Sequence, residues 1–188
     1  MTFKECENLN LLMKNFKKSW FIAGGWALDL YIGKKTRHHE DIEIGIFRND
    51  QLYLKDYFKG WKFKKIVNGQ VYEWRDEILE LPIHEVYVFN ENTNEQIEIL
   101  LNELNNNEWV YRRDLRITKP LNTTFSYTEL GIPYLNPEIV LLFKTSHTRQ
   151  KDNQDFKFFI NQLDDKKREW LSKNLKLTNP NHKWIDYL

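Results

Sequence analysis

Residues 24–44 read GGWALDLYIGKKTRHHEDIEI, a segment in which a glycine pair opens a helix and a polar loop leads into a strand. Directly before it, the apolar run Trp20 to Ala23 predicts a short buried strand. Trp26 to Ile32 have the apolar spacing of a helix, which Gly33 ends. From Asp41 to Phe47, acidic or small residues alternate with isoleucines, which predicts a second strand. The segment therefore predicts strand, glycine turn, helix, loop and strand in succession.

Two acidic side chains share one face of the second predicted strand. Because the facing of a strand repeats every two residues, Asp41 and Glu43 project to the same side. Paired carboxylates of this kind bind hard cations such as Mg²⁺. Taken alone, the pair fits a solvated strand face better than a metal site.

The residues before the acid pair are favourable for binding a phosphate. Gly24 and Gly25 have no side chains, so a phosphate can approach backbone N–H groups at the positive end of the helix. A tight turn alone explains the two glycines equally well. The loop from Lys34 to His39 adds three fixed positive charges and two imidazoles, which is typical of a site for a polyanion bridged to a metal.

The rest of the chain predicts an α+β fold with a helical C-terminal third. Apolar periodicity, turn signals and capping residues predict helices over 3–18 and 49–58, a hairpin of 61–67 with 70–75, a second antiparallel pair of 83–89 with 96–101, and helices over 137–147, 152–162, 165–175 and 181–187. We expect a core at residues 1–135 and a helical segment at 136–188 that packs on it.

The glycine pair, the loop and the acid pair together resemble a known family. A Gly-Gly turn, a short helix, Thr36-Arg37-His38-His39 and then acid-hydrophobic-acid at 41–43 are similar to the N-terminal signature of small nucleotidyltransferases. The similarity is greatest to the lincosamide nucleotidyltransferases and the aminoglycoside adenylyltransferases. Later segments at 109–113, 131–144 and 151–156 also resemble bacterial proteins of this group, so the resemblance spans the chain.

The resemblance implies a nucleotidyltransferase-like mixed β-sheet with flanking helices and a defined site. In such a site the turn at Gly24 and Gly25 cradles the triphosphate of an NTP, here expected to be ATP, and Asp41 and Glu43 bind Mg²⁺. An acceptor hydroxyl then attacks the α-phosphorus and pyrophosphate leaves. The further nucleotide-binding residues expected are Arg37, His39 and Lys144, although Lys144 fits a lysine that snorkels from a packed helix equally well.

A third carboxylate normally completes this kind of site, and the sequence offers two candidates. Glu98 lies between isoleucines on a predicted strand and is the preferred catalytic and metal-binding residue beside Asp41 and Glu43. Glu85 has the same local form on the partner strand. In the lincosamide enzymes an acid lies two residues before a His of a comparable strand, whereas Pro82 precedes His84 here.

Composition restricts the function further. The 188 residues include 28 Lys and Arg against 27 Asp and Glu, a net charge of +1, which is too low for a protein that binds duplex nucleic acid or an anionic membrane. The single cysteine, Cys6, excludes an intrachain disulfide. The acidic N-terminus and the short apolar stretches favour a cytoplasmic protein without a signal peptide or membrane span.

We therefore predict an enzyme that transfers a nucleoside monophosphate to a small hydroxylated molecule. Two alternatives stay open: a catalytically inactive binding or regulatory protein of this fold, and a nucleotidyltransferase that acts on tRNA or protein. Arg112 and Arg113 have two interpretations, a clamp for phosphate or, preferred here, a surface pair that neutralises Asp114 and nearby acids. Five aromatic residues on or near the predicted sheet have two interpretations, as walls for the acceptor or, for most of them, simply as core: Tyr72, Trp74, Tyr87, Trp109 and Tyr111.

Overall fold

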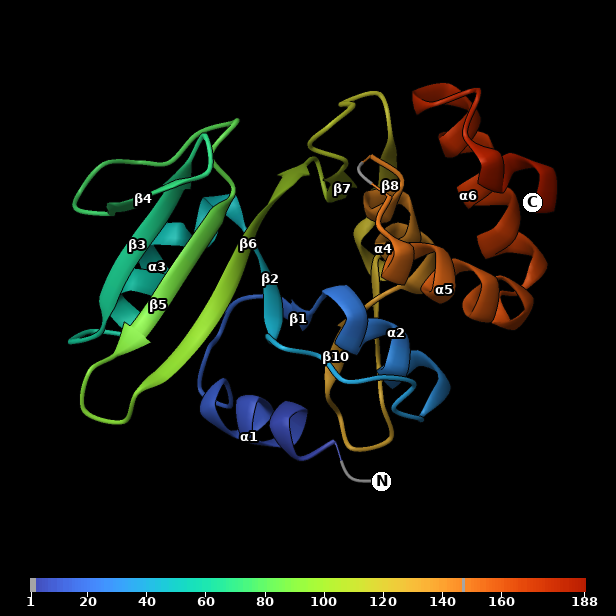
Figure 1. The fold of residues 1–188 in the computed structure, drawn as a ribbon. Helices are drawn as coiled ribbons and strands as arrows, with labels where there is room; N and C mark the ends of the chain where they lie inside the picture. The colour runs from blue at the N-terminus through green and yellow to red at the C-terminus, as the bar shows by residue number, and fades with distance from the viewer. Residues whose placement is uncertain (1–2, 147) are drawn as a thin grey trace.

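A mixed β-sheet runs through the centre of the protein, as the computed structural model of residues 3–146 and 148–188 shows (Figure 1). Its main path has the order β4-β3-β5-β6-β2-β1-β10-β9, and β7 and β8 continue from β6. The strands are β1 (Trp20–Ile22), β2 (Glu43–Phe47), β3 (Lys62–Val67), β4 (Gln70–Glu73), β5 (Glu85–Asn90), β6 (Glu95–Asn105), β7 (Glu108–Val110), β8 (Thr118–Pro120), β9 (Phe125–Tyr127) and β10 (Pro133–Leu135). The predicted α+β class and mixed sheet are confirmed.

Two parallel pairings bring together strands that are far apart in the sequence. β2 pairs in parallel with β6, and β1 pairs in parallel with β10, whereas the other neighbours are antiparallel. The central strands are buried on the side that faces the core, where Ile44 of β2 lies next to Ile99 of β6 and both are fully buried. Burial of such side chains stabilises the sheet by about 25 cal/mol per Å² of apolar surface.

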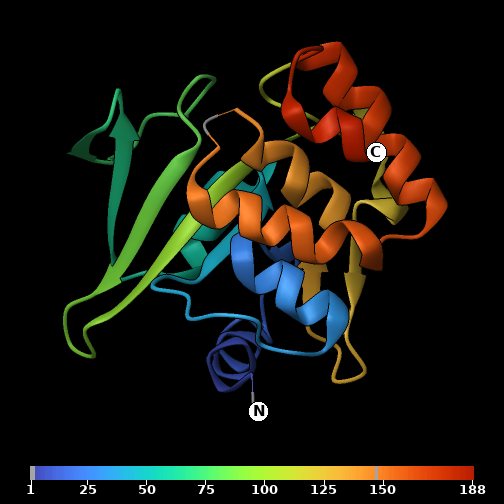
Figure 2. The same cartoon turned by 45° about the vertical axis from the view of Figure 1, so that its right-hand side comes forward.

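Helices cover the central strands. They are α1 (Lys4–Leu12), α2 (Gly24–Ile32), α3 (Gln51–Tyr57), α4 (Pro137–Lys144), α5 (Gln150–Phe159) and α6 (Asp165–Thr178), with 3-10 turns η1 (Arg48–Asp50), η2 (Leu121–Thr123), η3 (Ile160–Gln162) and η4 (Lys183–Tyr187). α4 contacts α2, α5 and α6, and Figure 2 shows α2, α4 and α5 together over the sheet. Within the described residues, each helix is too short or too polar to cross a membrane.

Several elements differ from the sequence prediction. The helix predicted over 3–18 ends at Leu12, and Met13 and Phe16 are buried from the turn that follows it. The helix predicted over 181–187 is the 3-10 turn η4. The helix predicted over 137–147 ends at Lys144, and residue 147 lies outside the described residues. β7 to β10 were not predicted, because three residues are too few to show an alternating pattern.

Candidate active site

The register of β2 and β6 brings the predicted acids together. Glu43 lies directly opposite Glu98 in this parallel pair, so the two side chains project from the same face of the sheet. On the next strand Tyr87 lies opposite Glu98, and Glu85, two residues earlier, therefore shares that face. Asp41 is exposed just before β2. The two candidates for the third carboxylate thus lie in one acidic wall with Glu43.

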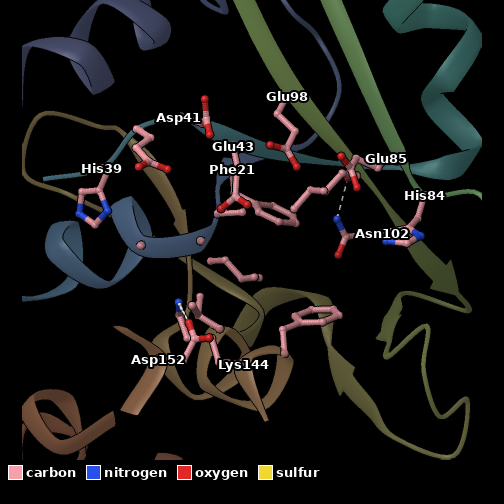
Figure 3. A pocket seen from close by; sticks show the side chains of 18 of the residues that line it. Phe21, His39, Asp41, Glu43, His84, Glu85, Glu98, Asn102, Lys144 and Asp152 are labelled. Carbon is pink, nitrogen blue, oxygen red and sulfur yellow. Dashed lines mark hydrogen bonds and ion pairs between the residues drawn. The ribbon is translucent and has the colours of Figure 1, made fainter. Parts of the chain in front are cut away.

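This wall belongs to a pocket of about 650 Å³, a volume typical of small-molecule sites. Figure 3 shows Asp41, Glu43, Glu98 and Glu85 along one side of it and Lys144 and Asp152 of α4 and α5 on the other. All eight predicted site residues line this pocket: Gly24, Gly25, Arg37, His39, Asp41, Glu43, Glu98 and Lys144. The fold therefore gathers them around one space, although their roles in binding and catalysis stay predictions.

The glycine pair lies in close contact with the acids and the basic loop. Gly24 begins α2 with a φ of +59°, and a Cβ added there would lie 1.5 Å from Oε2 of Glu43. A Cβ on Gly25 would lie 2.5 Å from Nδ1 of His39 and 2.8 Å from Nη2 of Arg37. Side chains at these positions would therefore push the carboxylate and the cations away from the first turn of α2.

A buried aspartate holds His39 in place. Asp29 of α2 is fully buried, and its Oδ2 lies 2.6 Å from Nε2 of His39 while its Oδ1 accepts a 2.5 Å hydrogen bond from Thr36. Trp26 packs against the His39 ring and donates a hydrogen bond to the backbone carbonyl of Asp41. These contacts fix the loop between α2 and β2, which directs Nδ1 of His39 toward Gly25.

Two of the predicted nucleotide-binding cations are already paired with carboxylates of α5. Arg37 donates two 3.0 Å hydrogen bonds to Asp155, and Lys144 lies 2.8 Å from Asp152 and 3.0 Å from Asp155. Burial opposes the ionisation of Asp152, but hydrogen bonds from Arg149 and Lys144 outweigh it and lower its pKa to about 2. The sequence did not indicate this network, because Arg37 and Asp155 are 118 residues apart.

The Asp152 carboxylate should make the protein sensitive to acid. A group whose pKa is lower in the folded state stabilises the fold above its unfolded pKa of 3.8, and this contribution disappears as the pH falls toward about 2. We therefore expect Asp152→Asn to lower the free energy of unfolding near neutral pH, and the difference from wild type to shrink below about pH 4. Urea unfolding at several pH values measures this. A difference that is constant with pH would contradict it.

The acidic wall carries more negative charge than its surroundings favour. Burial, followed by the charges of Glu43, Glu85 and Asp41, raises the pKa of Glu98 to about 8. Burial also raises the pKa of Glu43, although Lys144 and Arg149 oppose this. A cation bound between these carboxylates would relieve their repulsion.

The donor set fits Mg²⁺ only together with a phosphate ligand. Among the residues that the structure describes, no three His, Cys, Asp or Glu side chains are placed to hold a metal ion by themselves. Mg²⁺ in nucleotide sites is usually bound by one or two carboxylates, by water and by the substrate's phosphates. The adjacent carboxylates of Glu43 and Glu98, opposite the glycine turn, match that arrangement.

The structure corrects one interpretation from the sequence and decides between the alternatives of another. Asp114 pairs with Arg116, whereas Arg112 and Arg113 line the pocket and pack on the ring of Phe143. Of the five aromatic residues with two interpretations, Tyr87 lines the pocket, whereas Trp74, Trp109 and Tyr111 are buried, which confirms the core alternative for them, and Tyr72 is exposed on β4. The aromatic rings that were missed are Phe21 and Phe143, whose apolar surroundings in the sequence indicate only burial.

The sequence places this fold in the nucleotidyltransferase class. A model of the aminoglycoside-2''-adenylyltransferase family matches residues 7–158, and the chain belongs to that family. The predicted resemblance and enzyme class are therefore confirmed at the level of the family.

Solved structures of antibiotic-modifying enzymes share the fold. The lincosamide antibiotic adenylyltransferase LnuA, bound to lincomycin, is 22% identical with a TM-score of 0.57, over 84% of this chain and 95% of LnuA. ANT(2'')-Ia in complex with adenylyl-2''-tobramycin is 12% identical with a TM-score of 0.60, over 93% of this chain and 98% of the other. At these identities the similarity shows the fold alone. No curated protein matches the sequence significantly.

Proposed function

We propose that this protein is a cytoplasmic enzyme that transfers a nucleoside monophosphate from an NTP, with ATP as the expected donor, to a hydroxyl of a small molecule and releases pyrophosphate. The observation that carries the proposal is the pairing of Glu43 with Glu98 opposite the Gly24-Gly25 turn in one pocket. It combines backbone donors for a polyphosphate with carboxylates for Mg²⁺, the two requirements of nucleotidyl transfer.

The residues have distinct roles in this proposal. The first turn of α2 and the side chain of His39 bind the triphosphate, and Arg37 and Lys144 add positive charge behind it. Asp41, Glu43 and Glu98 would hold Mg²⁺ together with the phosphates of the substrate, and the ion would neutralise charge on the phosphate oxygens. The protein itself contributes mainly position and electrostatic stabilisation.

Glu98 is the better of the two candidates for receiving the proton of the acceptor hydroxyl. Glu98 lies directly opposite Glu43 on the neighbouring strand, so its carboxylate borders the proposed site of the metal and the reacting phosphate. One oxygen of Glu85 already accepts a 2.9 Å hydrogen bond from the hydroxyl of Tyr87. We therefore assign proton acceptance to Glu98 and the orientation of the acceptor to Glu85.

The charges that line the pocket and the small molecules bound in two similar structures both support a small acceptor. Arg37, Lys144 and Arg149 of the pocket wall are paired with carboxylates, and Asp41, Glu43, Glu98 and Glu85 line the opposite side, which disfavours a tRNA backbone there. Of two solved structures with this fold, one is bound to lincomycin and the other to adenylyl-2''-tobramycin, and both ligands are or contain small antibiotics. An antibiotic-like hydroxylated molecule is thus the proposed acceptor class.

Mass spectrometry of acceptor mixtures tests the proposal directly. We expect that incubation of lincosamides and aminoglycosides with each NTP and Mg²⁺ gives a product heavier by one nucleoside monophosphate, together with pyrophosphate, and that Asp41→Asn gives neither. Nucleotide binding by calorimetry without pyrophosphate release from any mixture, with bulk tRNA and protein included, would instead indicate a catalytically inactive relative.

A further inference from the structure

His84 lies at the end of the pocket that is away from the glycine turn. It comes just before β5, and its backbone carbonyl accepts a 2.7 Å hydrogen bond from the N–H of Leu101 on β6. Figure 3 shows its ring at one end of the pocket and His39 at the other, with Glu43 and Glu98 between them. Because the glycine turn is next to His39, the nucleotide proposed there leaves the end with His84 for the acceptor.

The contact at Nδ1 determines which nitrogen of the His84 ring carries the hydrogen. Nδ1 lies 2.8 Å from the backbone carbonyl oxygen of Pro82. A carbonyl oxygen only accepts hydrogen bonds, so Nδ1 carries the hydrogen and Nε2 of the neutral ring keeps a free electron pair. Burial, followed by the charge of Arg112, lowers the pKa of the imidazole, although the Pro82 contact and Glu85 oppose this. The neutral ring with an unprotonated Nε2 is therefore the form present near pH 7.

Nε2 of His84 is an unused hydrogen-bond acceptor in this pocket. Within the described part of the chain, this atom makes no hydrogen bond or ion pair. His39 differs, because its Nε2 lies 2.6 Å from a carboxylate oxygen of Asp29. A nitrogen with a free electron pair does not bind an anion, and the nearby charge of Arg112 disfavours a cation. The group that fits Nε2 of His84 is therefore a neutral donor, such as a hydroxyl.

We propose that Nε2 of His84 accepts a hydrogen bond from a second hydroxyl of the acceptor molecule, distinct from the hydroxyl that reacts. The inference rests on the proposed function, which places the nucleotide at the glycine turn and the reacting hydroxyl at Glu98. Tyr87 lies opposite Glu98 in the pairing of β5 with β6, and His84 comes three residues before Tyr87, about 10 Å along an extended chain. His84 therefore favours acceptors that carry hydroxyls at two separate places.

NMR of the ring nitrogens in the wild-type protein tests this contact without any substitution. In a long-range proton–nitrogen correlation spectrum at neutral pH, we expect His84 to have a protonated Nδ1 and an unprotonated Nε2. Titration with lincomycin, and separately with tobramycin, should shift the Nε2 signal for at least one of the two antibiotics. A hydrogen on Nε2 in the free protein, or an Nε2 signal that neither antibiotic moves, would overturn the proposal.

Two substitutions separate the free acceptor atom of His84 from its contact with Pro82. His84→Asn keeps an amide donor near the position of Nδ1 but has no atom at the position of Nε2, whereas His84→Gln places an amide oxygen close to that position. We expect His84→Asn to raise KM for the antibiotic about tenfold, with kcat and KM for the NTP within about twofold of wild type. His84→Gln should recover part of this loss.

The outcomes distinguish this inference from the proposed function. If transfer occurs but His84→Asn leaves KM for the antibiotic within about twofold of wild type, His84 does not bind the acceptor and the proposed function is unaffected. A loss in kcat at unchanged KM would assign His84 to the chemical step and would also overturn the inference. If wild type transfers nothing, yet an antibiotic shifts the Nε2 signal and His84→Asn weakens its binding in calorimetry, the hydroxyl site stands and the proposed function fails.

Discussion

Glu43→Gln is expected to reduce kcat for nucleotidyl transfer by about 10³-fold or more, equivalent to about 4 kcal/mol of transition-state stabilisation. Gln has the same size and fits against Gly24, but it removes the charge that binds the metal ion next to Glu98. Steady-state pyrophosphate release with Mg²⁺ and the donor NTP measures the effect. The fold should tolerate the change, because Gln removes a charge that burial already disfavours.

Glu95→Gln is the matched control for Glu43→Gln. Glu95 lies at the start of β6, on the strand that carries Glu98, but it is exposed and outside the pocket. Its substitution should leave kcat within about twofold of wild type. If Glu43→Gln keeps more than about a tenth of wild-type activity, Glu43 is not a metal ligand in the reaction.

Gly24→Ala is expected to lower kcat/KM by about 10²-fold or more, because small displacements of reacting groups have effects of this size. The added Cβ would lie 1.5 Å from Oε2 of Glu43, so the carboxylate has to leave the first turn of α2. The φ of +59° adds a backbone cost of about 1 kcal/mol to the free energy of unfolding. Calorimetry with a nonhydrolysable Mg²⁺-nucleotide and thermal unfolding measure the two effects separately.

The other end of the same helix provides the control for this variant. Gly33 follows α2 with a φ of +67°, and among the described residues no atom lies within 4 Å of a Cβ added there. Gly33→Ala therefore has the same backbone cost without displacing a side chain of the site. We expect the two variants to lose similar stability and only Gly24→Ala to lose activity. Equal losses of activity would mean that general destabilisation, and not contact with Glu43, explains the effect.

Local patterns predicted the elements whose partners are near in the sequence. The Asn68-Gly69 turn between alternating residues indicated the hairpin of β3 and β4, and both central residues have positive φ there. The pairing of β2 with β6 and of β1 with β10 could not be predicted from periodicity. Parallel neighbours need long connections, and no local signal specifies which strand will be adjacent.

For the candidate site, too, the local motifs were predictable from the sequence and the tertiary contacts were not. The acids Asp41 and Glu43 and the glycine pair follow from one continuous segment, and the form of Glu98 matched a family pattern. The environment of these residues was not predictable, because it depends on tertiary contacts. Lys144 was expected to be free for phosphate, yet Asp152 and Asp155 hold it, and Arg112 was expected on the surface, yet it lines the pocket.

The ion pairs that α5 makes also determine when, during translation, the pocket can form. The glycine turn, the basic loop and β2 leave the ribosome early, but Asp155, which holds both Arg37 and Lys144, is translated more than a hundred residues later. Until then Arg37 lacks the carboxylate with which it pairs, and the wall opposite Glu43 and Glu98, to which Lys144 and Asp152 belong, does not exist. A nascent chain therefore cannot form the complete pocket during most of its synthesis, and the proposed nucleotide binding is expected to be a late event that follows the docking of α5.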